Sequence, residues 1–248
     1  MDTKQLFGLN FLDVSLNKAA GIVADNAAHG RRQQVYFVNA HCINVAARDS
    51  EYRDILKGSP NLFADGVGMS IASGLFGSKL QNNVNGTDLF PLVCDEAVSR
   101  GISIGLLGAE PGVADKCAAE MRARVPGLDI RITEHGFLKE EEERKAISRI
   151  NDSGIGILFV AKGVPAQERW VNDNFDLLKV PVIAAVGALF DFYSGNVKRA
   201  PQFLRTLRLE WFYRLLGEPR RLFKRYVLGN PKFLLRAIWF RISRQESI

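Results

Sequence analysis

The chain has 248 residues, 47% of them hydrophobic, which is enough to bury one full core and at most a small second unit. Its three cysteines, Cys42, Cys94 and Cys117, lie too far apart for a disulfide framework or a structural zinc site, so a reducing, cytoplasmic location fits best. No run of roughly 20 apolar residues predicts a membrane-spanning helix, and no apolar stretch near the N-terminus predicts export.

The formal net charge of +6 is distributed unevenly. Residues 196–248, here called the basic segment, carry 13 Lys and Arg residues against three acidic ones, a net charge of +10. The remaining 195 residues therefore have a net charge of −4. We expect two units, a catalytic domain over 1–195 and a basic helical appendage over 196–248.

Six short stretches in the first unit are almost continuously apolar, which is typical of strands covered on both faces. They are Gln34–Val38, Leu62–Ala64, Ile102–Leu107, Leu128–Thr133, Ile155–Ala161 and Val182–Val186. The segments between them, such as Val113–Arg124 and Glu140–Ile150, have helical length and polar faces. This alternation predicts an α/β fold with a Rossmann-like parallel sheet.

Ligands of such sheets bind beyond the carboxyl ends of the strands, so the loops at those ends are candidate sites. Asp65 follows the stretch Leu62–Ala64 on a turn with Gly66 and Gly68. The carboxylate of Asp65 could be a catalytic base, or it could cap a helix over Val67–Leu75. Taken alone, the pattern favours the cap.

Two further loops carry candidate binding groups. Gly108–Gly112 follows Ile102–Leu107 and precedes a helix, so its backbone N–H groups could bind a phosphate, although many ordinary turns look the same. Gln167 and Glu168 fall in the first helical turn after Ile155–Ala161. Their side chains could hold a sugar or nucleotide, or only cap that helix.

Helix breakers at 217–219 and 229–231 predict about three short amphipathic helices in the basic segment. Leu204, Leu207 and Trp211 recur at helical spacing there. Basic helices with aromatic residues on an apolar face are typical of proteins that lie on an anionic membrane surface. Nucleic-acid binding is the rival interpretation, but the aromatics lack a base-stacking pattern, so we expect a lipid partner and no nucleic acid. Part of the segment could also pack on the core.

Taken in order, motifs over nearly the whole chain resemble the WecG/TagA/CpsF glycosyltransferase family. The motifs are residues 37–40, 64–68, 85–89, 107–114, 135–137, 163–170, 186–192, 197–201, 210–214 and 218–221. The resemblance implies transfer, with inversion, of N-acetylmannosamine or a related sugar from a UDP-sugar to a polyprenyl-diphosphate-linked sugar. Such transfer serves surface polysaccharide or cell-wall polymer synthesis at the inner face of the cytoplasmic membrane.

The resemblance also assigns roles to individual residues, and it favours Asp65 as the catalytic base over the helix cap. It implies a nucleotide-sugar pocket, to which we assign Asn39, Gly108, Ala109, Gly112, Gln167 and Glu168. We assign to the acceptor or the diphosphates Asp88, Arg214, Arg221 and Arg225. The segment Asp173–Asp176 has the wrong spacing for a DxD metal motif, so we expect neither a metal nor another cofactor.

Two positions depart from the common family pattern. Phe37 stands where many members have Thr, and Asn83 stands where many have Arg. Both positions should flank the pocket, so a glucose, glucuronic acid or modified mannosamine donor stays open. The chain is also compatible with a homo-oligomer.

Two other classes of protein compete with a glycosyltransferase as interpretations of the sequence. A nucleotide-cofactor oxidoreductase shares the Rossmann-like fold, but no GxGxxG motif with a following acidic residue is present. A membrane-tethered scaffold would explain the basic segment but not the grouping of Asp65, Gln167 and Glu168 at strand ends.

Overall fold

The computed structural model describes residues 2–207 and 209–243, so Arg208 and 244–248 of the basic segment lie outside the described residues. An eight-stranded sheet forms the centre of the molecule, in the order β1-β2-β4-β3-β8-β7-β5-β6, and all pairs except β1–β2 are parallel. The strands are β1 (Thr3–Leu6), β2 (Leu9–Leu12), β3 (Gln33–Val38), β4 (Asn61–Ala64), β5 (Ile104–Gly108), β6 (Ile130–Glu134), β7 (Ile157–Ala161) and β8 (Val182–Ala185). The predicted α/β fold is confirmed.

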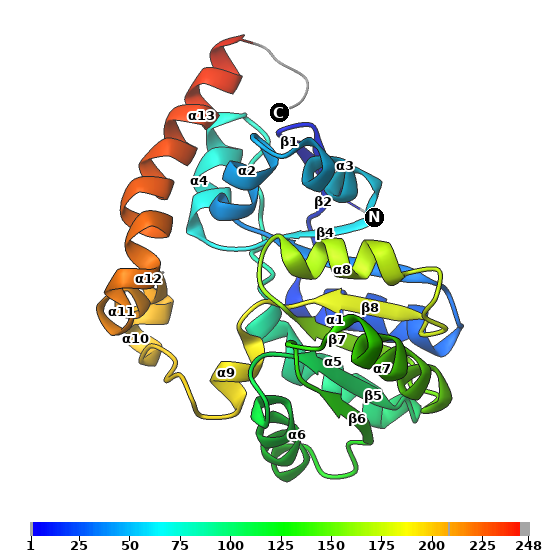
Figure 1. The fold of residues 1–248 in the computed structure, drawn as a ribbon. Coiled ribbons are helices and arrows are strands. Elements are labelled where there is room, and N and C mark those ends of the chain that lie inside the picture. The colour runs from blue at the N-terminus through cyan, green and yellow to red at the C-terminus, as the bar shows by residue number, and fades with distance from the viewer. Residues whose placement is uncertain (1, 208, 244–248) are drawn as a thin grey trace.

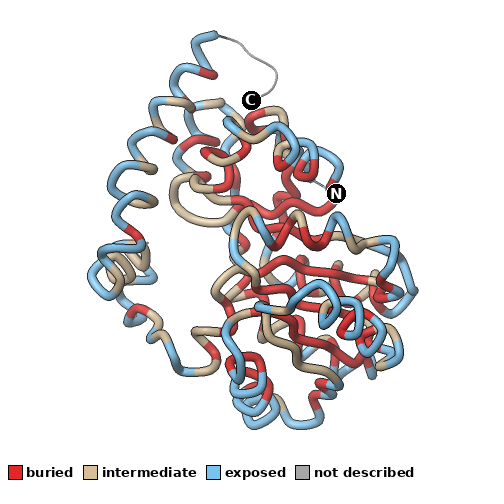
Figure 2. Tube along the Cα trace, in the orientation of Figure 1, coloured by how far each residue is buried: buried red, intermediate tan, exposed pale blue. Residues whose placement is uncertain are grey.

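Helices cover both faces of the sheet and bury two separate apolar clusters against it (Figure 1). One face carries α1 (Leu16–Ala28), α5 (Gly86–Arg100), α6 (Val113–Arg124) and α9 (Leu189–Tyr193). The other carries α2 (Ala40–Ala46), α3 (Ser50–Gly58), α4 (Val67–Leu75), α7 (Glu140–Asp152) and α8 (Ala166–Asn174). Apart from the edge strands β1 and β6, the strands are accordingly buried along most of their length (Figure 2). Burial on both faces explains why their sequences are almost continuously apolar.

The six predicted strands are all present, with ends that differ by up to two residues. The antiparallel hairpin of β1 and β2 was not predicted. Its two-residue turn, Phe7-Gly8, has φ values of 57° and 75°, as hairpin turns with two left-handed residues require. Phe7 adopts this conformation while its buried ring packs against Phe76, Phe233 and Phe240, which compensates for the backbone strain.

The basic segment leaves the core after α9 and comes back to it along α13, which lies beside α2 and α4 (Figure 1). Its helices are α10 (Gln202–Thr206), α11 (Glu210–Gly217), α12 (Pro219–Phe223), the π-helical turn η1 (Lys224–Leu228) and α13 (Gly229–Ser243). The buried side chains of Phe233, Ala237 and Phe240 hold α13 against the core. Part of the segment therefore packs on the core, while its outer side is largely exposed (Figure 2).

The prediction that Gly229-Asn230-Pro231 ends a helix was wrong, because helical structure runs without interruption from Pro219 to Ser243. A proline inside a helix lacks an N–H donor and clashes with the carbonyl four residues earlier. Here that carbonyl belongs to Val227, inside η1, where the wider turn gives the proline room. Within the described residues, no helix is both long enough and apolar enough to span a membrane.

Candidate active site

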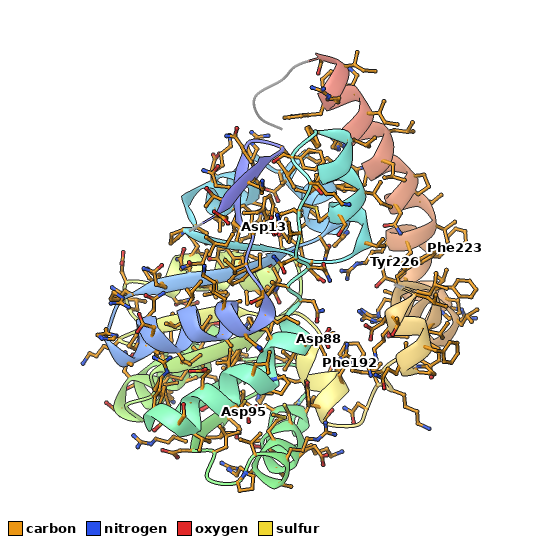
Figure 3. All side chains as sticks on the ribbon, turned by 180° about the vertical axis from the view of Figure 1, so that it is seen from behind. Asp13, Asp88, Asp95, Phe192, Phe223 and Tyr226 are labelled. Atoms are coloured by element: carbon orange, nitrogen blue, oxygen red, sulfur yellow. The ribbon has the colours of Figure 1, made fainter. Side chains whose placement is uncertain are left out.

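A cavity of about 1040 Å³ lies between the carboxyl ends of the central strands and the basic segment. Loops that follow β3, β4, β7 and β8 form the wall on the core side, and α11, η1 and α13 form the opposite wall. In Figure 3, Asp88 and Phe192 from the core and Tyr226 from η1 mark the two sides of this space. The cavity therefore occupies the place where parallel sheets usually bind ligands.

Asp65 lies on the core side of this cavity, directly after β4. It does not cap α4: the N-cap residue is Gly66, and no side chain caps that end. The helix-cap interpretation of Asp65 was thus wrong, because the positive φ of 91° at Gly66 turns the chain before the helix begins. The Asp65 carboxylate is left facing the cavity.

The surroundings of Asp65 suit a proton acceptor. Burial raises the pKa of its carboxyl above the ordinary range, while a hydrogen bond from Asn39 and the charges of Arg225 and Arg214 oppose the rise. Asn39 is itself held in place, because its Oδ1 caps α2 by accepting from the N–H groups of His41 and Cys42. A carboxylate with a raised pKa is a stronger base than one in water.

Asp88 also lines the cavity, but its two carboxylate oxygens are already engaged. Oδ1 accepts from Arg199 Nη1 at 2.6 Å, and Oδ2 accepts from Asn85 Nδ2 at 2.7 Å. Burial acts to raise the pKa of Asp88, yet these two hydrogen bonds and the Arg199 charge lower it overall. Arg199 also pairs with Glu210 at 3.3 Å, so one guanidinium ties α5 to the start of α11.

Gln167 lines the cavity, whereas its neighbour Glu168 does not. Gln167 Oε1 accepts from the N–H of Gly187 at 2.8 Å, and Gln167 Nε2 donates to Glu168 Oε1 at 2.8 Å. Glu168 is only 1% exposed, and burial raises its pKa to about 7. The first turn of α8 thus places one amide at the cavity and one carboxyl beneath it.

The loop Gly108–Gly112 is not among the cavity's lining residues. It follows β5, four strands from the β4 end that carries Asp65, a distance of about 19 Å across the sheet. Its shape still requires glycine, because a Cβ on Gly108 would lie 2.3 Å from the carbonyl oxygen of Ala161. Ala109 is left-handed at φ 57°, and its N–H donates to that same carbonyl.

The predicted arginines Arg214, Arg221 and Arg225 all line the cavity from the side of the basic segment. The Arg214 guanidinium lies 5.0 Å from the centre of the Phe192 ring, and Arg221 pairs with Glu218. Within the described residues, the Nε groups of Arg214 and Arg225 are buried and have no hydrogen-bond partner. Buried cationic donors of this kind can bind an anion that enters the cavity.

The sequence did not reveal the ion pairs of Arg199, although Arg199 and Glu210 both stand in the quoted motifs.

Both departures from the family pattern, Phe37 and Asn83, line the cavity. Asn83 Oδ1 accepts from the N–H of Gly66 at 2.5 Å, beside Asp65. Among the described residues, no three His, Cys, Asp or Glu side chains gather where they could hold a metal ion.

Comparisons with known proteins identify the family of this chain. The model of the "Glycosyl transferase WecG/TagA/CpsF family" matches residues 4–247. An N-acetylglucosaminyldiphosphoundecaprenol N-acetyl-beta-D-mannosaminyltransferase of Bacillus spizizenii is 31% identical over 94% of this chain and 90% of its own length. A protein of the same name from Bacillus subtilis is 34% identical over 80% of this chain and 76% of its own. The chain therefore belongs to the WecG/TagA/CpsF family of glycosyltransferases.

Proposed function

We propose that this glycosyltransferase moves N-acetylmannosamine, or a closely related sugar, from a UDP-sugar to a sugar carried on polyprenyl diphosphate. One observation carries the proposal. Asp65, a carboxylate with a raised pKa, lines one side of the cavity, and a wall of arginines lines the opposite side. The names of the two Bacillus relatives support this donor and acceptor type.

In this mechanism Asp65 removes the proton from the acceptor hydroxyl. The resulting oxygen attacks the anomeric carbon of the donor as the bond from that carbon to UDP breaks on the opposite face, which inverts the configuration. General base catalysis of this kind contributes about 10²–10⁴ to a rate. Asn39 holds the Asp65 carboxylate by its hydrogen bond, and Gln167 holds the Gly187 loop.

Two diphosphates must be accommodated, one in the donor and one in the acceptor. Negative charge develops on departing UDP and needs cations or oriented donors to stabilise it. We assign both diphosphates, of the donor and of the acceptor, to the cationic wall formed by Arg214, Arg221 and Arg225, without a metal ion. The predicted nucleotide contacts of Gly108, Ala109 and Gly112 stay a proposal, as does that of Glu168, which reaches the cavity through Gln167.

The acceptor's lipid requires the enzyme to work at a membrane, and the basic segment supports a peripheral position at the inner face of the cytoplasmic membrane. On α13, exposed apolar residues recur at helical spacing on the side away from the core: Leu235, Ile238, Trp239 and Ile242. Residues 219–243 include seven Lys and Arg residues and no acidic one. Such a surface fits anionic lipid.

The experiment that tests the proposal measures UDP release from a panel of UDP-sugars, in EDTA, with and without a polyprenyl-diphosphate N-acetylglucosamine analogue. Release that depends on the acceptor, with UDP-N-acetylmannosamine among the best donors, would support the proposal. Acceptor-dependent release only after Mg²⁺ is added would contradict the metal-free mechanism. Absence of release with every donor would contradict the proposed acceptor.

A further inference from the structure

The active-site cavity has walls of two chemical kinds. The core side presents polar groups, among them Asn39, Asp65 and Gln167. The flank where α4 faces η1 and α13 is mainly apolar instead: Val67, Ile71, Val227, Phe233 and Leu234 line it, together with the polar residues Ser70 and Asn230. A diphosphate and a sugar alone would leave this second wall in contact with water, which is unfavourable.

Close packing between α4 and α13 makes this flank continuous. A Cβ on Gly68 would lie 3.4 Å from the Phe233 ring, so the two helices meet closely there. Val67 and Ile71 are one helical turn apart and therefore lie on the same side of α4. The apolar wall thus continues along α4, away from the strand end that carries Asp65.

Exposure along this wall changes from inside to outside. Phe233 is fully buried, whereas Ile71 is 48% exposed and Val227 is 38% exposed while both still line the cavity. These two residues stand on opposite helical elements, α4 and η1, at the mouth of the cavity. An extended hydrocarbon chain could therefore lie partly inside the cavity and leave it between them.

The charged part of the cavity adjoins this apolar wall, since Arg225 and Val227 belong to the same turn of η1. Arg225 and Arg214 provide buried Nε donors without a partner in the described residues. A diphosphate ester of a hydrocarbon matches both features at once, with its phosphates at the guanidiniums and its chain on the apolar wall.

We propose that Val67, Ile71, Val227 and Leu234 form a binding site for the first isoprenoid units of the lipid acceptor. The inference deepens the proposed function and rests on it for the identity of the ligand. The hydrocarbon chain of the acceptor then contributes to its affinity through contacts inside the cavity. This contribution is separate from any attachment of the basic segment to a membrane.

The test is a binding measurement on the full chain without membranes or detergent, so it does not depend on turnover. The probes are methyl diphosphate and farnesyl diphosphate, both below micellar concentrations, measured by calorimetry. Burial of even one isoprene unit predicts a Kd for farnesyl diphosphate at least about tenfold lower than that for methyl diphosphate. Equal Kd values for the two probes would overturn the proposal.

Variants locate the site. Ile71→Ser should raise the Kd for farnesyl diphosphate at least about fivefold and leave that for methyl diphosphate unchanged, because only the hydrocarbon contact is lost. Ile71→Leu should restore tight binding. Leu75→Ser is the matched control, since Leu75 lies one turn further on α4 and is 41% exposed but does not line the cavity. Equal effects of Ile71→Ser and Leu75→Ser would overturn the location.

A competition experiment distinguishes binding of farnesyl diphosphate in the cavity from its binding to the exposed face of α13. Excess methyl diphosphate should displace farnesyl diphosphate, because both probes use the same guanidiniums. Farnesyl diphosphate that stays bound would be attached elsewhere, which would overturn the proposal. Failure of the UDP-release assay with every donor would count against the proposed function, and it would leave these binding results intact.

Discussion

Asn39 and Asp65 are joined directly, because Asn39 Nδ2 donates a hydrogen bond to Asp65 Oδ2 at 3.3 Å. The two residues follow neighbouring parallel strands, β3 and β4, so the sheet itself brings them together. The same Asn39 side chain caps α2 through its Oδ1. One residue therefore fixes the start of a helix and the position of the proposed base.

This hydrogen bond predicts a pH effect. Asp65 accepts a proton only when ionised, so kcat/KM should fall as the pH drops through its pKa, which burial places above the ordinary range. Asn39→Ser keeps a capping oxygen but removes the amide donor that lowers this pKa. The acid limb of the pH profile should then move to higher pH.

The pH profile needs one control, because the pKa of Glu168 is raised to about 7. Glu168→Gln removes that titration and should leave the acid limb where it was. An acid limb that moves with Glu168→Gln and not with Asn39→Ser would contradict the assignment of the base to Asp65.

The bridge from Asp88 through Arg199 to Glu210 predicts a positioning role for Arg199. Arg214 lies one turn after Glu210 on α11, so the bridge should hold Arg214 at the cavity. Arg199→Ala should lower kcat/KM for the acceptor about 10- to 100-fold, equivalent to roughly 1.4–2.8 kcal/mol. Steady-state kinetics normalised to folded protein would measure this loss.

Two comparisons separate this positioning role from a general loss of stability. Arg199→Lys keeps the charge and should restore part of the activity. Arg144→Ala removes a largely exposed ion pair with Glu140 and should change kcat/KM little. Activity of Arg199→Ala equal to that of the wild type would show that the bridge does not position Arg214.

Glu168 predicts a pH dependence of stability. Its pKa rises from the ordinary 4.5 to about 7 on folding, so the folded state favours the protonated form. Its contribution is fully present below about pH 4.5 and is lost as the pH rises through 7, a change of about 3 kcal/mol. The wild type should lose this stabilisation when the pH is raised from 5 to 8.5, whereas Glu168→Gln should not. The unfolding free energy of Glu168→Gln relative to wild type should therefore rise by about 3 kcal/mol over this range.

Urea unfolding at the two pH values measures the difference. A wild-type and variant pair that keeps the same stability gap at both pH values would show that the carboxyl titrates normally in the folded protein.

The exposed face of α13 predicts attachment to anionic vesicles. Replacing Ile238 and Trp239 together by Ser should weaken binding to phosphatidylglycerol vesicles about tenfold or more, because apolar contact with the interface is lost. Leu177→Ser is the control, since Leu177 is as exposed but lies outside the basic segment. Vesicle sedimentation measures both, and equal binding of the double variant and the wild type would contradict the prediction.

The sheet could be predicted from sequence because its central strands are buried on both faces and therefore read as apolar runs. The β1–β2 hairpin could not be predicted. Lys4, Gln5 and Asn10 break its apolar pattern, and Phe7 is an unusual residue for a left-handed turn position. The tertiary contacts of Phe7 outweigh its local preference, and no local pattern reports such contacts.

The candidate site was predicted in part. Asp65, Asn39 and Gln167 follow the parallel strands β4, β3 and β7, whose ends meet at one cavity. The arginines on the opposite wall belong to the basic segment, and only the family resemblance predicted their role. The pair of Asp88 with Arg199 could not be predicted, since the two residues are 111 positions apart and oppositely charged residues are common. The separation of the Gly108 loop from Asp65 depends on strand order, which apolar runs do not reveal.

The proposed mechanism depends on Asp65 as the catalytic base. The most direct measurement compares wild type and Asp65→Asn for sugar transfer, using the UDP-sugar identified by the donor panel, together with the donor Kd of each. If Asp65 is the base, kcat should fall by about 10²–10⁴ with a nearly unchanged donor Kd, because the amide keeps the shape of the carboxylate but cannot accept the proton. Turnover of Asp65→Asn within a few-fold of wild type would contradict this role of Asp65.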